Sequence, residues 1–230
     1  ETGSDRLRRV INKTVTNEQI LDRADLIFRS GIENLKLYFM IGLPTEEDAD
    51  LVAIRDLVAA LRDRMLAHAR ERGTIGRLVA SVNPLVPKPG TTYQWMPMTQ
   101  ASVIDEKSDR LRHLVADLEN VYFNIKSERH SFYQGLLSLG DRRVADVIEI
   151  AERNGGNWRA AVAESGVDAA AYLYRDRGAD PFLPWQIIDG GVKSAFFREE
   201  LEKSQRAEWT MPAKRARRAD DHIPVLTPEL

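Results

Sequence analysis

The sequence predicts an α/β fold over residues 1–100, followed by a mainly α-helical region. Two apolar segments, 35–41 and 77–87, are too short for core helices and are typical of buried strands. Apolar residues recur at helical spacing over 16–30, and a second helical pattern, about 46–72, separates the two strands. This alternation of helices and strands predicts a parallel sheet built from βα units.

The two long helices of this region carry start and stop signals. Thr16 is a candidate N-cap of the first helix, and Gly31 is a candidate residue just beyond its end. Thr45 is the candidate N-cap of the second helix, and Glu46 and Glu47 place negative charge in its first turn. Both helices are therefore expected to begin and end near these residues.

After residue 100 the pattern changes, and no strand is predicted. The expected helices cover residues 101–126, 130–139, 141–153, 157–165, 168–175 and 195–208. The Gly- and Pro-rich segment 176–193 is expected to pack down, because it contains two bulky aromatic residues. Three regions result: an α/β region over residues 1–100, a helical extension over 101–208, and a flexible tail over 209–230 with the basic cluster Lys214, Arg215, Arg217 and Arg218.

Composition narrows the classes of function. The formal net charge of −2 gives no electrostatic reason to expect nucleic acid or an anionic membrane as partner. Apolar runs are far shorter than the ~20 residues of a spanning helix, and no signal-peptide pattern is present, so a cytoplasmic location is expected. The chain has no cysteine, which excludes disulfides, thiolate nucleophiles and a cysteine-ligated iron–sulfur cluster held by this chain.

The first candidate site is the turn after the strand 35–41, in "LYFMIGLPTEED". In parallel α/β folds, ligands bind beyond the carboxyl ends of the strands. Gly42 removes a side chain there, so that the backbone can approach a flat ligand, and Thr45 with Glu46 opens a helix at the same rim. The alternative is a tight turn that needs Gly42 and Pro44 for geometry alone.

The N-terminal stretch "ETGSDRLRRVINK" is the second candidate, with a helix expected over about 5–11. Glu1, Ser4 and the first-turn N–H groups could meet hydroxyls or a carboxylate, and three basic residues could supply positive charge. Those residues are Arg8, Arg9 and Lys13. The alternative is an ordinary helix cap beside a solvated basic face.

The third candidate is "NPLVPKPGTTYQW", residues 83–95. Its prolines cannot donate to a sheet, so the segment must leave the second strand as a stiff loop. The first interpretation is that the segment forms a rim or lid over a ligand. The alternative is that it is a packed connector to the helical region. The side chains that it carries are Lys88, Tyr93, Gln94 and Trp95.

Other catalytic patterns are absent from the sequence. The histidines at 68, 113, 130 and 222 are dispersed, and none has metal-ligand spacing. There is no G-x-S-x-G elbow or Walker phosphate loop, and the paired carboxylates are adjacent residues that point in different directions on a helix.

Taken together, the three loops resemble the C-terminal half of the radical S-adenosylmethionine (SAM) domain. The downstream stretches "SFYQGLLSLGDRRVADVI" and "LPWQIIDGGV" resemble the helical extension of a subgroup that often carries an upstream B12-binding-type domain. The resemblance covers essentially residues 1–200. It implies the C-terminal part of a (β/α) barrel, and a parent enzyme that uses SAM and a 4Fe–4S cluster for radical chemistry; whether this parent also uses cobalamin is left open.

The resemblance also implies a set of SAM-binding residues. Glu1 and Ser4 would approach the ribose and methionine, and Arg8, Arg9 or Lys13 would meet the carboxylate. The turn residues Ile41, Gly42, Leu43 and Glu46 would lie beside the adenine. The end of the second strand would pair with the adenine edge through the segment from Asn83 to Val86.

The sequence departs from this family in one respect: the three-cysteine cluster loop is missing. The chain, which does not begin with Met, is therefore expected to be a catalytically inactive fragment that binds no cofactor by itself. An exposed sheet edge would be covered by the helical region, by a second copy, or by an unusual arrangement of the fragment. The alternative reading is that 101–208 is a protein- or RNA-docking module with the α/β region as its support.

Overall fold

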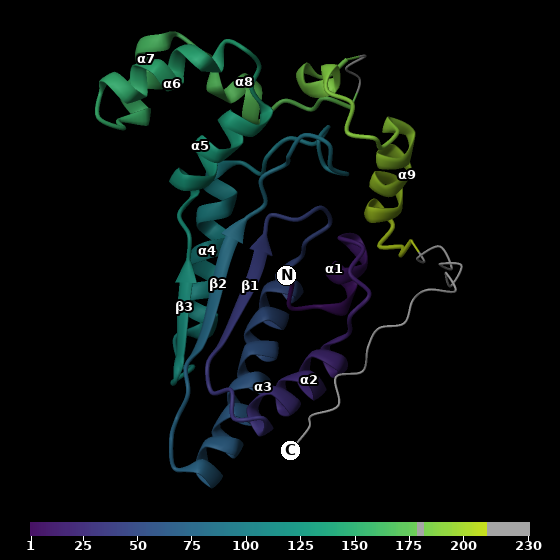
Figure 1. Cartoon of the computed structure of the whole chain (residues 1–230), viewed down its shortest axis with the longest axis vertical. Helices are drawn as coiled ribbons and strands as arrows, with labels where there is room; N and C mark the ends of the chain where they lie inside the picture. The colour runs from purple at the N-terminus through teal and green to yellow at the C-terminus, as the bar shows by residue number, and fades with distance from the viewer. Residues whose placement is uncertain (179–181, 211–230) are drawn as a thin grey trace, which may run out of the picture.

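The computed structural model describes residues 1–178 and 182–210 and shows an α/β fold. Within these residues the sheet has three parallel strands in the order β1-β2-β3, as Figure 1 shows. The strands are β1 (Leu35–Ile41), β2 (Leu78–Pro84) and β3 (Val121–Ile125). The sheet is open, and the described residues form no closed barrel.

Helices connect the strands because neighbouring parallel strands need a crossover. α3 (Asp48–Arg72) joins β1 to β2, and α4 (Ala101–Val115) joins β2 to β3. Two helices precede the sheet, α1 (Asp5–Val10) and α2 (Asn17–Arg29).

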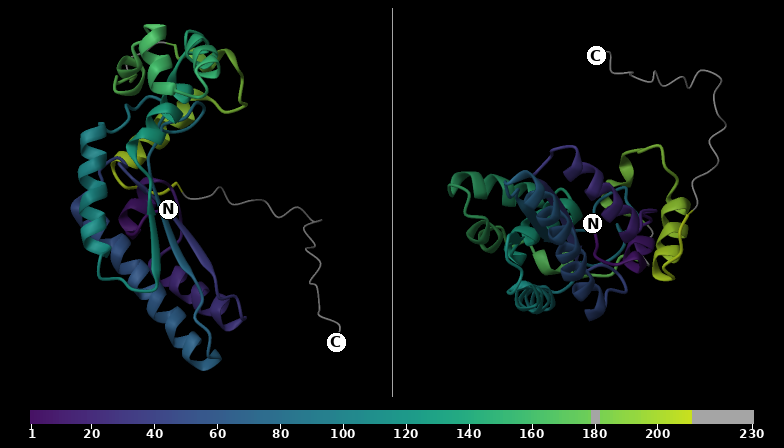
Figure 2. Two further views of the ribbon diagram at one scale, coloured as in Figure 1. Left: turned by 90° about the vertical axis from the view of Figure 1, so that its left-hand side faces the viewer. Right: turned by 90° about the horizontal axis from the view of Figure 1, so that it is seen from below.

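The main core lies between one face of the sheet and helices α2, α3 and α4. Side chains alternate along a strand, and Phe39, Ile41, Leu78, Ala80 and Val82 all point to this face and are buried. They pack against apolar rows of the helices, notably Leu51, Ile54, Val58, Leu61 and Met65 of α3. Figure 2 shows α3 and α4 together on this side of the sheet.

The opposite face of the sheet is open. Tyr38 and Tyr122 are 57% and 56% exposed there, and Lys36 and Asn124 are exposed as well. The register aligns Tyr38 with Ser81 of β2 and Asn124 of β3, so the face is largely polar.

The helical region lies beyond the carboxyl ends of the strands (Figure 1). Its elements are α5 (Glu128–Leu139), α6 (Val144–Arg153), α7 (Trp158–Ser165), α8 (Ala169–Leu173), the 3-10 helix η1 (Pro184–Ile187) and α9 (Ser194–Gln205). A second core joins α5 to α6, α7 and α8 through residues such as Leu136, Val147 and Ala161. The expected segments of this region therefore are helical.

The expectation of one helix over 101–126 and of no strand after residue 100 is wrong. α4 ends at Val115, a turn with Asn120 at φ +62° follows, and Val121–Ile125 pairs with β2 as strand β3. Leu118 and Val121 continue the helical spacing of α4, which explains the error. The sheet thus crosses the boundary expected at residue 100.

The start and stop signals expected for α2 are confirmed, whereas the start expected for α3 is wrong. The Thr16 side chain accepts a hydrogen bond from the Gln19 backbone N–H at 3.2 Å, and Gly31 has φ +86°. The N-cap of α3, however, is Glu47, because Thr45 adopts φ +59° in the turn before the helix. The expected basic cluster at 214–218 lies outside the described residues.

None of the helices in the described part of the chain combines the length and the apolar character that crossing a bilayer requires.

We expect Leu61→Ala to lower the free energy of unfolding by about 2–5 kcal/mol, because Leu61 is fully buried between α3 and the sheet. Leu26→Ala on α2 is the matched control, since Leu26 is 50% exposed and should lose less than about 1 kcal/mol. Urea denaturation measures both. Equal losses would contradict the packing described here.

Candidate functional site

A cavity of about 400 Å³ opens at the carboxyl ends of β1 and β2. The strands contribute Met40 and Asn83, the loop after β2 contributes Val86 and Lys88, and α5 contributes Gln134. Glu1 completes the wall. The cavity therefore lies where the ends of parallel strands in α/β folds ordinarily bind ligands.

Three polar side chains of the cavity have no partner in the part of the chain that the structure describes. Within the described residues, no hydrogen bond or ion pair engages the side chains of Asn83, Lys88 and Gln134. Asn83 is half-buried, while Lys88 and Gln134 are exposed. An amide next to apolar Val86, with a cation at the rim, can hydrogen-bond a planar heterocycle and attract an anionic group.

Glu1 is held against the edge of the sheet. Its carbonyl oxygen accepts a hydrogen bond from the Met40 backbone N–H at 2.8 Å, on the side of β1 that faces away from β2. Its carboxylate pairs with the Lys13 Nζ at 3.1 Å. Lys13 is thus paired with a residue that lines the cavity, although it does not line the cavity itself.

Ser4 and Arg8 take part in structural contacts. The Ser4 Oγ caps α1 by accepting from the Leu7 N–H at 3.1 Å and donates to the Asp50 Oδ1 at 2.6 Å. The Arg8 guanidinium is buried; it donates to the Thr2 carbonyl at 2.8 Å and to the side chains of Asp5 and Asn17. Neither side chain lines the cavity.

Asp50 anchors the N-terminal segment to α3. Its carboxylate accepts hydrogen bonds from Ser4, from the Glu47 backbone N–H at 2.9 Å and from Arg6. Burial acts against the charged form, but these three donors outweigh it and lower the pKa of Asp50 below its ordinary value. The charged carboxylate therefore holds α1 against α3.

The turn after β1 is bare for a structural reason. Gly42 has φ +77°, and a Cβ there would lie 2.8 Å from the Ile104 Cδ1 and 3.0 Å from the Thr99 Oγ1. The Glu46 carboxylate accepts from the Gly42 N–H at 3.1 Å and from the Lys107 Nζ at 2.5 Å. The space that the missing side chain leaves is thus filled by α4 and the loop residue Thr99 that precedes it.

The main residues proposed from the sequence divide into two groups. Glu1, Asn83 and Val86 line the cavity, and Lys13 reaches it through Glu1. The others lie in the surrounding structure: Ser4, Arg8, Ile41, Gly42, Leu43 and Glu46. Ile41 and Leu43 are buried, in the main core and in a small cluster with α1.

Sequence reasoning missed Met40 and Gln134. The alternation of side chains along β1 could have placed Met40 on the face opposite Ile41. Nothing local could have placed Gln134, which comes from α5 in the helical region.

The loop after β2 is mostly a packed connector. Trp95 and Gln94 are buried, and the Tyr93 hydroxyl donates to the Val10 carbonyl at 2.9 Å and lies 2.9 Å from the Ser204 Oγ. Burial raises the pKa of Tyr93. Lys88 alone among the four side chains expected at a rim lies exposed.

No group of three or more metal-binding side chains gathers within residues 1–178 and 182–210.

Comparison with known proteins gives one distant likeness. The chain is 27% identical over 149 residues to "Uncharacterized protein MJ0966" of Methanocaldococcus jannaschii. The matched segment is 65% of this chain and 31% of that protein, so the chain spans less than a third of its relative's length. No family model and no solved structure matches the chain.

We expect Gly42→Ala to lower the free energy of unfolding by about 2–4 kcal/mol, because the new Cβ meets Ile104 in a strained left-handed backbone. Gly31→Ala is the control: Gly31 also has a positive φ but faces open space, so it should lose only about 1 kcal/mol. Equal losses in urea denaturation would show that crowding at Gly42 is unimportant.

We expect Asp50→Asn to cost about 1–3 kcal/mol of stability at pH 7. Because the folded pKa of Asp50 is lowered, its contribution is present above the ordinary value of 3.8 and is lost as the pH falls through and below that value. The difference from the wild type should therefore shrink below about pH 4. Asp48→Asn, at an exposed position of the same helix, should have little effect at any pH. A pH-independent deficit in Asp50→Asn would contradict the role of the charge.

Proposed function

We propose that this chain is the C-terminal part of a radical SAM (β/α) barrel with its helical extension, belonging to a longer enzyme that uses SAM and a 4Fe–4S cluster. The observation that carries the proposal is the cavity at the ends of β1 and β2. It is lined by Glu1, Asn83 and Val86, which come from two separate stretches that resemble SAM-binding motifs of that family.

The topology supports the same proposal. Three parallel strands follow one another in chain order, with their crossover helices on one face. Consecutive βα units of a barrel have this arrangement, in which the helices form the outer layer and the opposite face points inward. The polar face, on which Tyr38 and Asn124 are exposed, would then line the interior.

In this proposal the residues of the cavity bind and orient SAM. The Asn83 amide and the neighbouring backbone would hold the adenine edge, and Val86 and Met40 would supply the apolar part of the site. Lys88 or Lys13 attracts the methionine carboxylate. Arg8 is left out because its guanidinium is buried and already engaged, and the Glu46 carboxylate holds the turn at Gly42.

The cluster does not fit this chain, because the chain has no cysteine to hold it. In the proposed parent, SAM and a reduced cluster would together supply the radical chemistry. The proposal therefore requires cluster-binding cysteines from a preceding segment of a longer parent, and assigns this chain the binding of SAM.

The parent protein, reconstituted anaerobically with iron and sulfide, reduced and given SAM, is expected to release 5′-deoxyadenosine, which mass spectrometry detects. The 230-residue chain under the same conditions should release none. A parent that binds no iron and forms no product would contradict the proposal and favour the docking hypothesis.

Two asparagine variants of the parent test the assignment of the cavity. Asn83→Ala should weaken SAM binding about tenfold, because one hydrogen-bonding group is lost. Asn124→Ala removes the same group from the same face of the sheet but outside the cavity, and should bind as the wild type does. Unchanged affinity in Asn83→Ala would move the SAM site elsewhere.

A further inference from the structure

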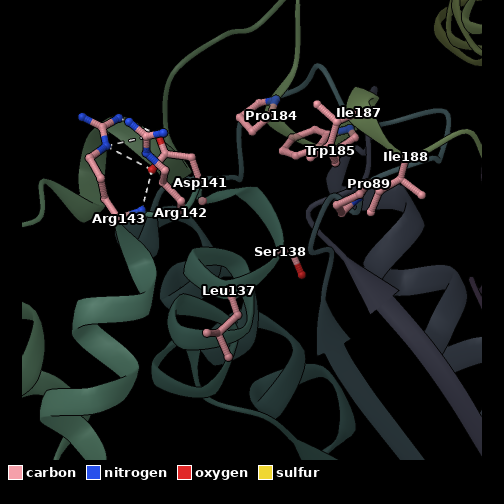
Figure 3. A pocket seen from close by; sticks show the side chains of 11 residues that line it. Pro89, Leu137, Ser138, Asp141, Arg142, Arg143, Pro184, Trp185, Ile187 and Ile188 are labelled. Atoms are coloured by element: carbon pink, nitrogen blue, oxygen red, sulfur yellow. Dashed lines mark hydrogen bonds and ion pairs between the residues drawn. The ribbon is translucent and has the colours of Figure 1, made fainter.

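A second and larger cavity lies in the helical region. It has a volume of about 700 Å³, within the range of roughly 300–1,000 Å³ of small-molecule sites. Figure 3 shows its construction: the end of α5 carries Leu137 below, η1 carries Trp185 and Ile187 on one side, and Arg142 and Arg143 lie on the other. One wall is apolar and the facing wall is cationic.

The apolar wall is unusually exposed. Ile187 and Ile188 are 80% and 74% exposed, and Leu137 is 48% exposed. Large aliphatic side chains that gather around one cavity at such exposure mark a binding surface, whereas single exposed ones need no explanation. The apolar body of a ligand would gain by covering them.

Trp185 is held in a fixed orientation. Its indole Nε1 donates to the Oε1 of the buried Gln94 at 2.7 Å, and its ring packs against a cluster that includes Leu139 and Leu173. The ring is therefore a preformed surface of the cavity, and a ligand does not have to order it on binding.

The two arginines of the cationic wall differ. Arg143 is committed to Asp141, with 2.6 Å between the Nη2 and the Oδ2, and this contact lowers the pKa of the Asp141 carboxyl so that it stays charged. Arg142 is exposed, and its guanidinium has no hydrogen bond or ion pair with any described residue. The wall thus presents one uncompensated positive charge, on a group with a planar fork of donors.

We propose that this cavity binds a small organic anion with an apolar body, whose carboxylate, sulfonate or phosphate meets Arg142 while its body packs on Trp185, Ile188 and Leu137. The charge lies on one side of the cavity and the apolar residues lie on the other, an arrangement that an amphipathic anion complements and a purely polar or purely apolar ligand does not. This inference does not rest on the proposed function, because the cavity at the ends of β1 and β2 shares none of these residues.

The test uses a matched pair of probes, 1-naphthaleneacetate and the uncharged 1-naphthaleneacetamide, titrated into the full chain by calorimetry. The acetate should bind one site with a dissociation constant on the order of 0.1–1 mM, as expected for a ligand of its size. The amide should bind about tenfold more weakly, because it lacks the charge that meets Arg142.

Variants test separately which residues contact the charged group of the ligand and which contact its apolar body. Arg142→Gln should reduce the affinity for the acetate about tenfold and leave that for the amide unchanged. Ile188→Ser should weaken both probes, because it removes apolar contact. Arg159→Gln, at another exposed arginine outside the cavity, should bind both probes as the wild type does.

Circular dichroism checks that each variant is folded, and all the substituted side chains are exposed. The proposal is overturned if neither probe binds at millimolar concentration, if acetate and amide bind equally, or if Arg142→Gln leaves acetate binding unchanged. A loss in Arg159→Gln equal to that in Arg142→Gln would show general charge attraction and would overturn it as well.

Discussion

The burial of one face of a parallel sheet against its crossover helices is the constraint on which the rest of the molecule depends. Residues such as Phe39, Val82 and Leu61 fill the space between β1, β2 and α3. Because side chains alternate along each strand, this burial sends Tyr38, Met40 and Asn83 to the other face. The same packing aligns the carboxyl ends of β1 and β2 and so creates the edge at which the first cavity opens.

The segments around that edge are held by charged side chains that satisfy backbone and hydroxyl groups. Glu46 accepts from the turn at Gly42 and pairs with Lys107 of α4, while Asp50 accepts from Ser4 and ties α1 to α3. Each carboxylate lies at the start of the α3 region, where the helix N-terminus also favours negative charge. Residues within stretches that resemble ligand-binding motifs, such as Ser4 and Glu46, therefore hold the scaffold together.

The two cavities are lined by different kinds of side chain and therefore fit different kinds of ligand. The one at the strand ends combines an unpartnered asparagine amide with apolar Val86 and a lysine at the rim. The one in the helical region sets a single arginine, unpaired within the described residues, opposite a wall of tryptophan and isoleucines. α5 contributes to both, since Gln134 lines the first, and Leu137, one turn further along the helix, lines the second. A ligand in either cavity would thus contact the same helix.

The sequence alone determined the features that depend on neighbours in the chain. The strand over 35–41, the cap at Thr16 and the left-handed residue at Gly31 follow from local hydrophobicity and backbone preference, and the structure has them there. Tertiary structure decided the features whose partners are distant. Val121–Ile125 became a strand because β2 offered an edge, although its spacing continued the pattern of α4. Arg8 was buried by Asn17 and Thr2, and Gln134 reached the cavity from the helical region. Local spacing carries no information on such contacts, because their free energy comes from burial against elements that only the fold brings together.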